Sequence, residues 1–269
     1  MHQVLIKNSF EDWRGAARQL LQAHAAPAEI LWTHDEQNGL LDEFPIEESV
    51  TTKVFKVPAD FLKIAETVAC VDDREKWSLL YRLLFRITHE NRDLLEIESD
   101  ADVRQALLFV KAIRRDEHKM HAFVRFKRVE NERGETFVAW HEPAHFIVER
   151  AAPFFVRRFG EMRFSLLTPK GCAHWDLEEL IFTAPVSSEN APAADAMENF
   201  WKTYYASVFN PARLKVRAMK AEMPVRFWRN LPEAELIPDL IRESTERTQK
   251  MIEHKANRQA VIDKLSTQK

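Results

Sequence analysis

The pattern of the chain changes from helix to strand within residues 111–128, which read Lys111-Ala-Ile-Arg-Arg-Asp-Glu-His-Lys-Met-His-Ala-Phe-Val-Arg-Phe-Lys-Arg128. Residues 103–117 have the apolar spacing of a helix, whereas residues 123–129 alternate as a strand does. The stretch holds seven Lys or Arg against two acids, a local charge of +5. It therefore predicts basic side chains gathered where a helix meets a sheet, which suits a polyanion. The other interpretation is an ordinary solvated face.

The chain before this junction is predicted to be mostly helical. Ser9 is placed to cap the first helix, and the apolar stripe from Trp77 to Ile87 marks a later one. We expect short strands at residues 4–6 and 30–32, and helices over 10–25, 58–68, a segment after Asp73, and a segment from Ser99 that carries Val103, Leu107, Val110 and Ile113 on one face.

The chain after the junction is predicted to form a sheet with helices around it. Alternating or apolar runs predict strands at residues 122–129, 135–140, 162–168, 173–176 and 180–183. Helices are expected over residues 143–159, from about 195 to 207, and beyond, with an Ala/Pro/Ser-rich linker at 184–196. The predicted fold class is α+β, with a small antiparallel sheet at about residues 122–183 packed among helices.

These elements suggest four segments. They are an N-terminal αβ segment (1–52), a helical region (53–120), a sheet-plus-helix core (121–242) and a polar C-terminal helix or tail (243–269), with 53–242 forming one compact domain.

Composition narrows the class of protein. The 269 residues are 45% hydrophobic and 30% charged, with a net charge of −3, as in ordinary soluble proteins. Cys70 and Cys172 stand apart, which suits a reducing compartment and excludes a cysteine zinc site. No apolar run is long enough to span a bilayer, and the N-terminus is too short and polar for a secretory signal, so we expect a cytoplasmic protein.

Motifs for nucleotide chemistry are absent from the sequence. It contains neither a phosphate-binding loop nor a dinucleotide fingerprint, and its five glycines leave little room for either. A nucleotide-hydrolysing or dinucleotide-dependent enzyme is therefore disfavoured, and we expect no cofactor.

Residues 141–145, His-Glu-Pro-Ala-His, spell the H-E-x-x-H pattern of zinc proteases. That chemistry needs both histidines one turn apart on a single helix. Pro143 favours a helix that begins at its own position, which leaves His141 outside it and His145 inside. The pattern is therefore interpreted as the start of a helix, and no metal site is predicted here.

His118 and His121 are predicted to bridge the end of a helix and the start of a strand. They are suited to a favourable interaction with the helix dipole, to phosphate or nucleobase contacts, or to metal and acid–base work with Asp116. The candidate acid–base or metal groups of the whole chain are Asp116, His118, His121, Glu142, His145 and Asp176.

Three basic clusters are candidates for binding nucleic acid. One is the junction itself, a second surrounds Gly160, and a third follows the N-cap pair Asn210-Pro211, where basic residues recur on one face of a predicted helix. Neighbouring aromatic rings are suited to stack on unpaired bases or to pack in the core. The candidates are Arg114, Arg115, Lys119, Arg125, Lys127, Arg157, Arg158, Arg163, Trp175, Tyr204, Tyr205, Asn210, Arg213, Arg217 and Lys220.

Three motifs resemble a bacterial family of probable DNA-metabolism proteins. They are His118-Lys-Met-His-Ala-Phe-Val-Arg-Phe126, the stretch from Glu142-Pro to Ala152-Pro-Phe-Phe-Val-Arg-Arg-Phe159, and Tyr204-Tyr-Ala-Ser-Val-Phe-Asn-Pro-Ala-Arg-Leu-Lys215. The resemblance covers about residues 4–245. That family is a domain of unknown function, fused to a uracil-DNA glycosylase-superfamily domain or encoded beside a putative DNA-repair radical-SAM protein. This chain resembles the stand-alone version.

The resemblance implies a role in DNA repair or modification beside a partner enzyme, and it implies no catalytic residues. The leading hypothesis is an accessory protein that presents DNA, preferably single-stranded or damaged, to a radical-SAM or uracil-DNA glycosylase-type partner. The first alternative is a metal- or acid/base-dependent enzyme that processes nucleic acid. The second is a protein–protein adaptor without DNA affinity, docked through the acidic segment 29–48 and the C-terminal helix.

Overall fold

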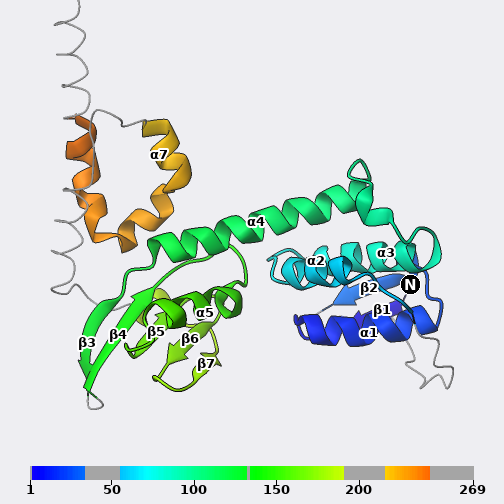
Figure 1. Ribbon diagram of the computed structural model, residues 1–269, viewed down its shortest axis with the longest axis horizontal. Helices are drawn as coiled ribbons and strands as arrows, with labels where there is room; N and C mark the ends of the chain where they lie inside the picture. The colour runs from blue at the N-terminus through cyan, green and yellow to red at the C-terminus, as the bar shows by residue number, and fades with distance from the viewer. Residues whose placement is uncertain (1, 34–54, 132–133, 191–215, 243–269) are drawn as a thin grey trace, which may run out of the picture. The chain divides into compact units, whose positions relative to one another are not determined.

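A computed structural model describes residues 2–33, 55–131, 134–190 and 216–242 (Figure 1). The fold is α+β, as predicted, with a two-stranded and a five-stranded sheet among helices. The chain divides into two compact units. The first unit comprises residues 1–118 with 144–147, and the second comprises residues 119–143 with 148–269.

The first unit begins with a β–α–β arrangement. Strands β1 (His2–Leu5) and β2 (Ile30–Thr33) pair in parallel, and helix α1 (Phe10–Gln22) with the 3₁₀ turn η1 (Pro27–Glu29) connects them. Such a connection is what a parallel pair requires. Ser9 caps α1 as predicted, because its hydroxyl accepts a hydrogen bond from the backbone N–H of Asp12 at 3.2 Å.

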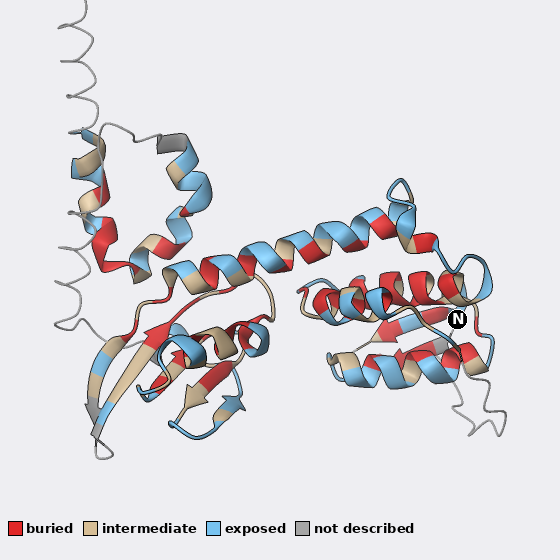
Figure 2. Cartoon of the chain, viewed as in Figure 1, coloured by how far each residue is buried: buried red, intermediate tan, exposed pale blue. Residues whose placement is uncertain are grey.

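Helices complete the first unit: α2 (Ala59–Ala69), α3 (Lys76–His89), the turn η2 (Leu94–Glu96) and most of α4 (Ala101–Phe123). Its core is aromatic. The rings of Trp13 and Trp77 stack with centroids 6.0 Å apart, and the buried Tyr81 hydroxyl donates to the carbonyl of Ala25 at 2.9 Å. Figure 2 shows the buried residues of α1 along one side of that helix, as expected for an amphipathic element.

The second unit is built on a five-stranded sheet in the order β3-β4-β5-β6-β7. Its strands are β3 (Lys127–Asn131), β4 (Gly134–Trp140), β5 (Phe164–Leu167), β6 (Cys172–Trp175) and β7 (Leu180–Thr183). The prediction of an antiparallel sheet is wrong at one pair, since β4 and β5 are parallel. Helix α5 (Val148–Arg158) lies in the connection between these two strands, as a parallel pair requires.

Short helical segments follow the sheet in the second unit. They are η3 (Ser188–Asn190), α7 (Val216–Glu222), η5 (Val225–Asn230) and η6 (Pro232–Leu236). Phe227 and Ile237, each 1% exposed, are at the centre of a small cluster there. The helix predicted from about residue 195 and part of the predicted linker lie outside the described residues.

Two element boundaries differ from the prediction. Helix α4 continues to Phe123 and the strand begins only at Lys127, so His118 and His121 both lie within a helix. Helix α5 begins at Val148 instead of Pro143, so His145 precedes the helix. Within the described ranges, no helix is both long and apolar enough to cross a bilayer.

Candidate nucleic-acid interface

Three of the predicted arginines surround one open hollow in the second unit. Arg157 and Arg158 lie at or next to the C-terminal end of α5, and Arg163 directly precedes β5. The hollow has a volume of about 790 Å³. Basic residues in the last turn of a helix interact favourably with its dipole, which favours two adjacent arginines at the end of α5.

The electrostatics of the hollow favour an anion. Its lining includes Glu135 and Glu161 beside the three arginines, and Glu135 is paired with Arg128 at 2.7 Å. Among the described residues, no acid forms an ion pair with Arg157 or Arg158. Guanidinium groups in such a position are suited to phosphate oxygens, which they contact bidentately.

Apolar groups also line the hollow. Phe159 is 36% exposed and Leu177 is 42% exposed. The guanidinium carbon of Arg158 lies 5.9 Å from the centroid of the Phe159 ring, within the range of a cation–π contact. An exposed aromatic ring next to arginines is suited to single-stranded nucleic acid, because the ring can stack on a base while the arginines bind its phosphate.

Trp175 supports the hollow without lining it. Its indole Nε1 donates to the carbonyl of Gly160 at 2.9 Å, which fixes the turn after α5. A side chain at Gly160 would place Cβ 3.0 Å from the carbonyl oxygen of Val156, so this tight turn favours glycine. Trp175 is therefore engaged in positioning the arginine-bearing segment.

Asp176 builds the turn between β6 and β7. Its carboxylate accepts the backbone N–H groups of Glu179 at 2.8 Å and Glu178 at 3.0 Å. These hydrogen bonds, with the nearby charge of Arg163, lower the pKa of Asp176. The turn forces Leu177 to a φ of 89°, a left-handed conformation that leucine rarely adopts. Asp176 thus shapes the rim on which Leu177 is displayed.

The other predicted basic residues are distributed over both units. Arg114 and Arg115 are exposed on the part of α4 that belongs to the first unit, whereas Lys119 is only 9% exposed. Arg125 is paired with the buried Glu233 at 2.9 Å and also donates to the carbonyl of Ala122. Its guanidinium is therefore engaged inside the second unit.

The remaining members of the predicted set are only partly described. Lys127 is half-buried on β3, and Lys220 is exposed on α7. Arg217 lies on α7, but its side chain is outside the described residues, as are Tyr204, Tyr205, Asn210 and Arg213 entirely.

The structure brings two of the acid–base candidates together, but through a backbone group. Asp116 is 4% exposed, and its carboxylate accepts the backbone N–H of His145 at 3.0 Å. The His145 ring uses Nδ1 to accept the N–H of Asp72 at 3.3 Å. His118 is exposed on α4. Asp116 and His145 therefore anchor residues 144–147 within the first unit.

His121 and Glu142 are likewise occupied by structural contacts in the second unit. The His121 ring stacks on Phe154 with centroids 4.1 Å apart, and its Nε2 lies 3.3 Å from the carbonyl of Ala151. Glu142 accepts the Trp140 indole N–H at 2.9 Å and pairs with Arg229. Burial would raise the pKa of Glu142, but these two partners outweigh it and lower the pKa.

His141, the first histidine of the H-E-x-x-H pattern, is 1% exposed and stacks on Phe227 with centroids 5.0 Å apart. Burial, aided by the charge of Arg226, lowers its pKa to about 4. His141 belongs to the second unit and His145 to the first. Within the part of the chain that the structure describes, no group of three or more His, Cys, Asp or Glu side chains is placed to hold a metal ion.

Sequence reasoning missed the apolar rim and the acidic members of the hollow. Phe159 ends a motif with the arginines, and it could have been included with them because it follows Arg158 directly. Leu177 and Glu135 carry no comparable signal, because they reach the hollow through the pairing of strands and a turn with positive φ.

The chain was compared with protein families, with curated proteins and with solved structures. No curated protein and no solved structure matches it. The model of one family, the domain of unknown function DUF4130, matches residues 74–233. This range includes α3, α4, the whole five-stranded sheet and the arginine-lined hollow. Because the match covers more than half of the chain, the protein belongs to the DUF4130 family.

Proposed function

We propose that the protein is an accessory factor in DNA repair or modification that binds single-stranded or damaged DNA through the arginine-lined hollow. The observation that carries the proposal is the convergence of Arg157, Arg158 and Arg163 on one open hollow. The resemblance of the sequence motifs to probable DNA-metabolism proteins supplies the nucleic-acid context. The partner that we propose, a radical-SAM or uracil-DNA glycosylase-type enzyme, is inferred from the same resemblance.

The chemistry of the hollow favours an unpaired strand over a duplex. Three guanidinium groups supply charge for successive phosphates, and exposed Phe159 supplies a ring for stacking. A base is free to stack on a side chain only when it is unpaired. Backbone contacts of this kind carry no sequence information, so the binding we propose is tolerant of sequence.

The first experiment measures binding of the full chain to labelled single-stranded, double-stranded and uracil-containing DNA over a salt series. We expect single-stranded DNA to bind best, with an affinity that falls steeply as salt is raised. Replacing Arg157, Arg158 and Arg163 together by alanine should lower the slope of log K against log salt by about 2, since each lost phosphate contact on a single strand contributes roughly 0.7.

A matched control removes the same charge from elsewhere on the chain. Arg74, Arg92 and Arg104 are exposed residues of the first unit, and their triple alanine variant has the same net charge as the test variant. The slope of log K against log salt for this control should differ from that of the wild type by no more than about 0.7, the contribution of one phosphate contact. Equal losses in both variants would mean that only total charge matters, and the hollow would not be the binding site.

Metal content measured on the same sample tests the enzymatic alternative, because a stoichiometric metal would favour it. If wild-type protein does not bind DNA even at low salt, the accessory role is wrong. Complex formation with the radical-SAM or glycosylase-type partner under those conditions would favour the adaptor instead.

A further inference from the structure

We propose that a pocket in the first unit binds a small organic carboxylate with an apolar body. The pocket has a volume of about 380 Å³, within the range of roughly 300–1,000 Å³ in which small-molecule sites fall. It is formed by α1, α2, α3 and the segment that begins at Phe55. The inference is independent of the proposed function, because none of these residues lines the arginine-lined hollow.

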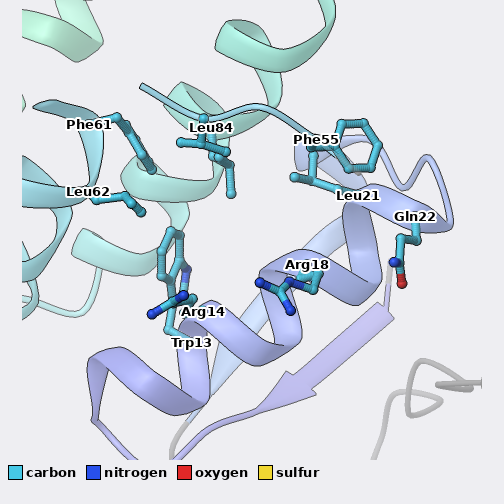
Figure 3. A pocket seen from close by; sticks show the side chains of 10 residues that line it. Trp13, Arg14, Arg18, Leu21, Gln22, Phe55, Phe61, Leu62 and Leu84 are labelled. Atoms are coloured by element: carbon cyan, nitrogen blue, oxygen red, sulfur yellow. The ribbon is translucent and has the colours of Figure 1, made fainter. Parts of the chain in front are cut away.

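The walls of the pocket are apolar. Trp13, Leu21, Phe61 and Leu84 line it and are at most 6% exposed, so they form a fixed wall built from the core of the unit. Figure 3 shows Phe61, Leu62 and Leu84 across from α1, and Phe55 beside Leu21. A ligand that fills this space is held by burial of its own apolar surface, which contributes about 25 cal/mol for each Å² removed from water.

Two arginine side chains also line the pocket. Arg14 and Arg18 are exposed and one helical turn apart on α1, and both line the pocket (Figure 3). Nowhere in the described ranges does either form an ion pair. Like charges at this spacing repel each other, which destabilises a helix by a few tenths of a kcal/mol. An anion bound between them relieves this repulsion.

Apolar walls beside two arginines favour one class of ligand, an anion with an apolar body. Beside the two arginines, the described lining offers only two uncharged polar groups, the amide of Gln22 and the buried indole N–H of Trp13, so most donors and acceptors of a nucleobase would be buried without partners. An aliphatic or aromatic carboxylate leaves no such group unpaired, because its body is apolar and its charged end meets arginine, which binds carboxylates bidentately.

The test uses decanoate as the probe and the full chain as the protein. Displacement of anilinonaphthalene sulfonate, together with changes in the Trp13 indole resonance, reports occupancy. We expect saturable binding of decanoate, with decanol binding at least about tenfold more weakly because it lacks the charge. Decyltrimethylammonium should not compete.

Two variants locate the site. Arg14→Gln with Arg18→Gln should weaken decanoate binding by about tenfold or more and leave decanol unchanged. Leu62→Trp, which places a larger side chain on the half-buried rim, should weaken both ligands. The control, Arg74→Gln with Arg92→Gln, removes equal charge from exposed sites and should bind decanoate as the wild type does.

Three results would overturn the proposal. They are no saturable binding to the wild type, equal binding of decanoate and decyltrimethylammonium, and unchanged binding in the Arg14→Gln/Arg18→Gln variant. Circular dichroism of each variant establishes that it is folded before binding is compared.

Discussion

At the scale of single residues, His141 is a titratable group that burial keeps neutral. Its pKa of about 4 in the folded chain lies below the ordinary value of 6.5. The unfolded chain therefore takes up a proton at this residue between these pH values while the folded chain does not. Above pH 6.5 the neutral His141 therefore costs no stability. As the pH falls from 6.5 toward 4, this residue lowers the free energy of unfolding by about 3 kcal/mol.

The first prediction follows from this shift. His141→Phe keeps a ring that stacks on Phe227 and removes the proton site, so its stability should fall less on acidification than that of the wild type. Urea unfolding at pH 7 and pH 4.5 should show the variant gaining about 2 kcal/mol relative to wild type at the lower pH. The exposed His118→Gln variant is the control. If wild type and His141→Phe lose stability in parallel, His141 is not the responsible group.

Leu177 gives the second prediction, because its φ of 89° is unfavourable for any residue with a branched side chain. Leu177→Gly should stabilise the fold by up to about 1 kcal/mol, since relief of the strain exceeds the entropy that glycine adds to the unfolded chain. Thermal unfolding measures this. The same variant should bind single-stranded DNA more weakly if the exposed side chain is part of the interface, so stability and affinity would change in opposite directions.

At the scale of elements, a buried lysine joins α2 to α3. Lys76 is 1% exposed, and its ammonium donates to the carbonyls of Ala69 and Val71, each at 2.7 Å. It also lies 4.7 Å from the centroid of the Trp77 ring. The carbonyls at the end of a helix lack intrahelical donors, and Lys76 supplies one to Ala69, the last residue of α2, and to Val71 two residues beyond it.

The third prediction tests this cap. Lys76→Met preserves the length of the side chain but leaves two inward carbonyls without this donor, so the free energy of unfolding should fall by about 2–4 kcal/mol. Lys63→Met, at a lysine whose side chain is 75% exposed, should change it by less than about 0.5 kcal/mol. Denaturant titration compares the two. Equal effects would show that the carbonyls find other donors.

Helices with strong local signals were predictable from the sequence. Ser9 capped α1, Pro58 preceded α2, and the stripe of α3 is buried as expected. The end of α4 was not predictable in the same way. Its helical stripe continues through Met120, which is fully buried, but the alternation that begins at Phe123 resembles a strand. Two periodicities overlap there, and the longer one determines the structure.

The start of α5 was missed because it depends on distant contacts. Pro143 is a good first residue for a helix, yet the N–H of His145 is bound by Asp116 and the N–H of Phe146 by the carbonyl of Cys70 at 2.8 Å. These hydrogen bonds hold residues 144–147 within the first unit, and the helix begins only at Val148. The parallel pairing of β4 with β5 was missed for the same reason, since pairing between distant strands leaves no local signature.

The candidate site was predictable in part. Arg157, Arg158 and Arg163 were grouped because they are close in sequence, and the structure places them around one hollow. Arg125 belonged to the same predicted set, but its partner Glu233 is more than a hundred positions away and could not be identified from the sequence. Charge is visible in a sequence, whereas its pairing is a tertiary property.

At the scale of the whole molecule, the chain passes between its two units three times, after residues 118, 143 and 147. The first unit is consequently discontinuous. Its short second piece, Ala144–Ile147, binds Asp116, Asp72 and Cys70 through the contacts described above. The first unit therefore depends on residues that follow two strands of the second.

The fourth prediction concerns fragments. A chain that ends at residue 118 lacks these contacts, whereas one that ends at residue 147 contains them. Hydrogen exchange should show α2 and α3 more protected in the longer fragment, by about 2–3 kcal/mol of opening free energy, because several hydrogen bonds to buried groups are restored. Equal protection in the two fragments would show that residues 144–147 only rest on a unit that is already complete.

This discontinuity sets an order of events during synthesis. A ribosome delivers the chain from its N-terminus, at roughly 5–20 residues per second. Residues 119–143 must emerge before Ala144–Ile147 can join the first unit. For that interval the nascent first unit lacks the hydrogen bonds that the N–H groups of His145 and Phe146 later donate to Asp116 and Cys70. A pause in translation between residues 118 and 144 would lengthen the time for which a chaperone or a protease meets this unfinished form.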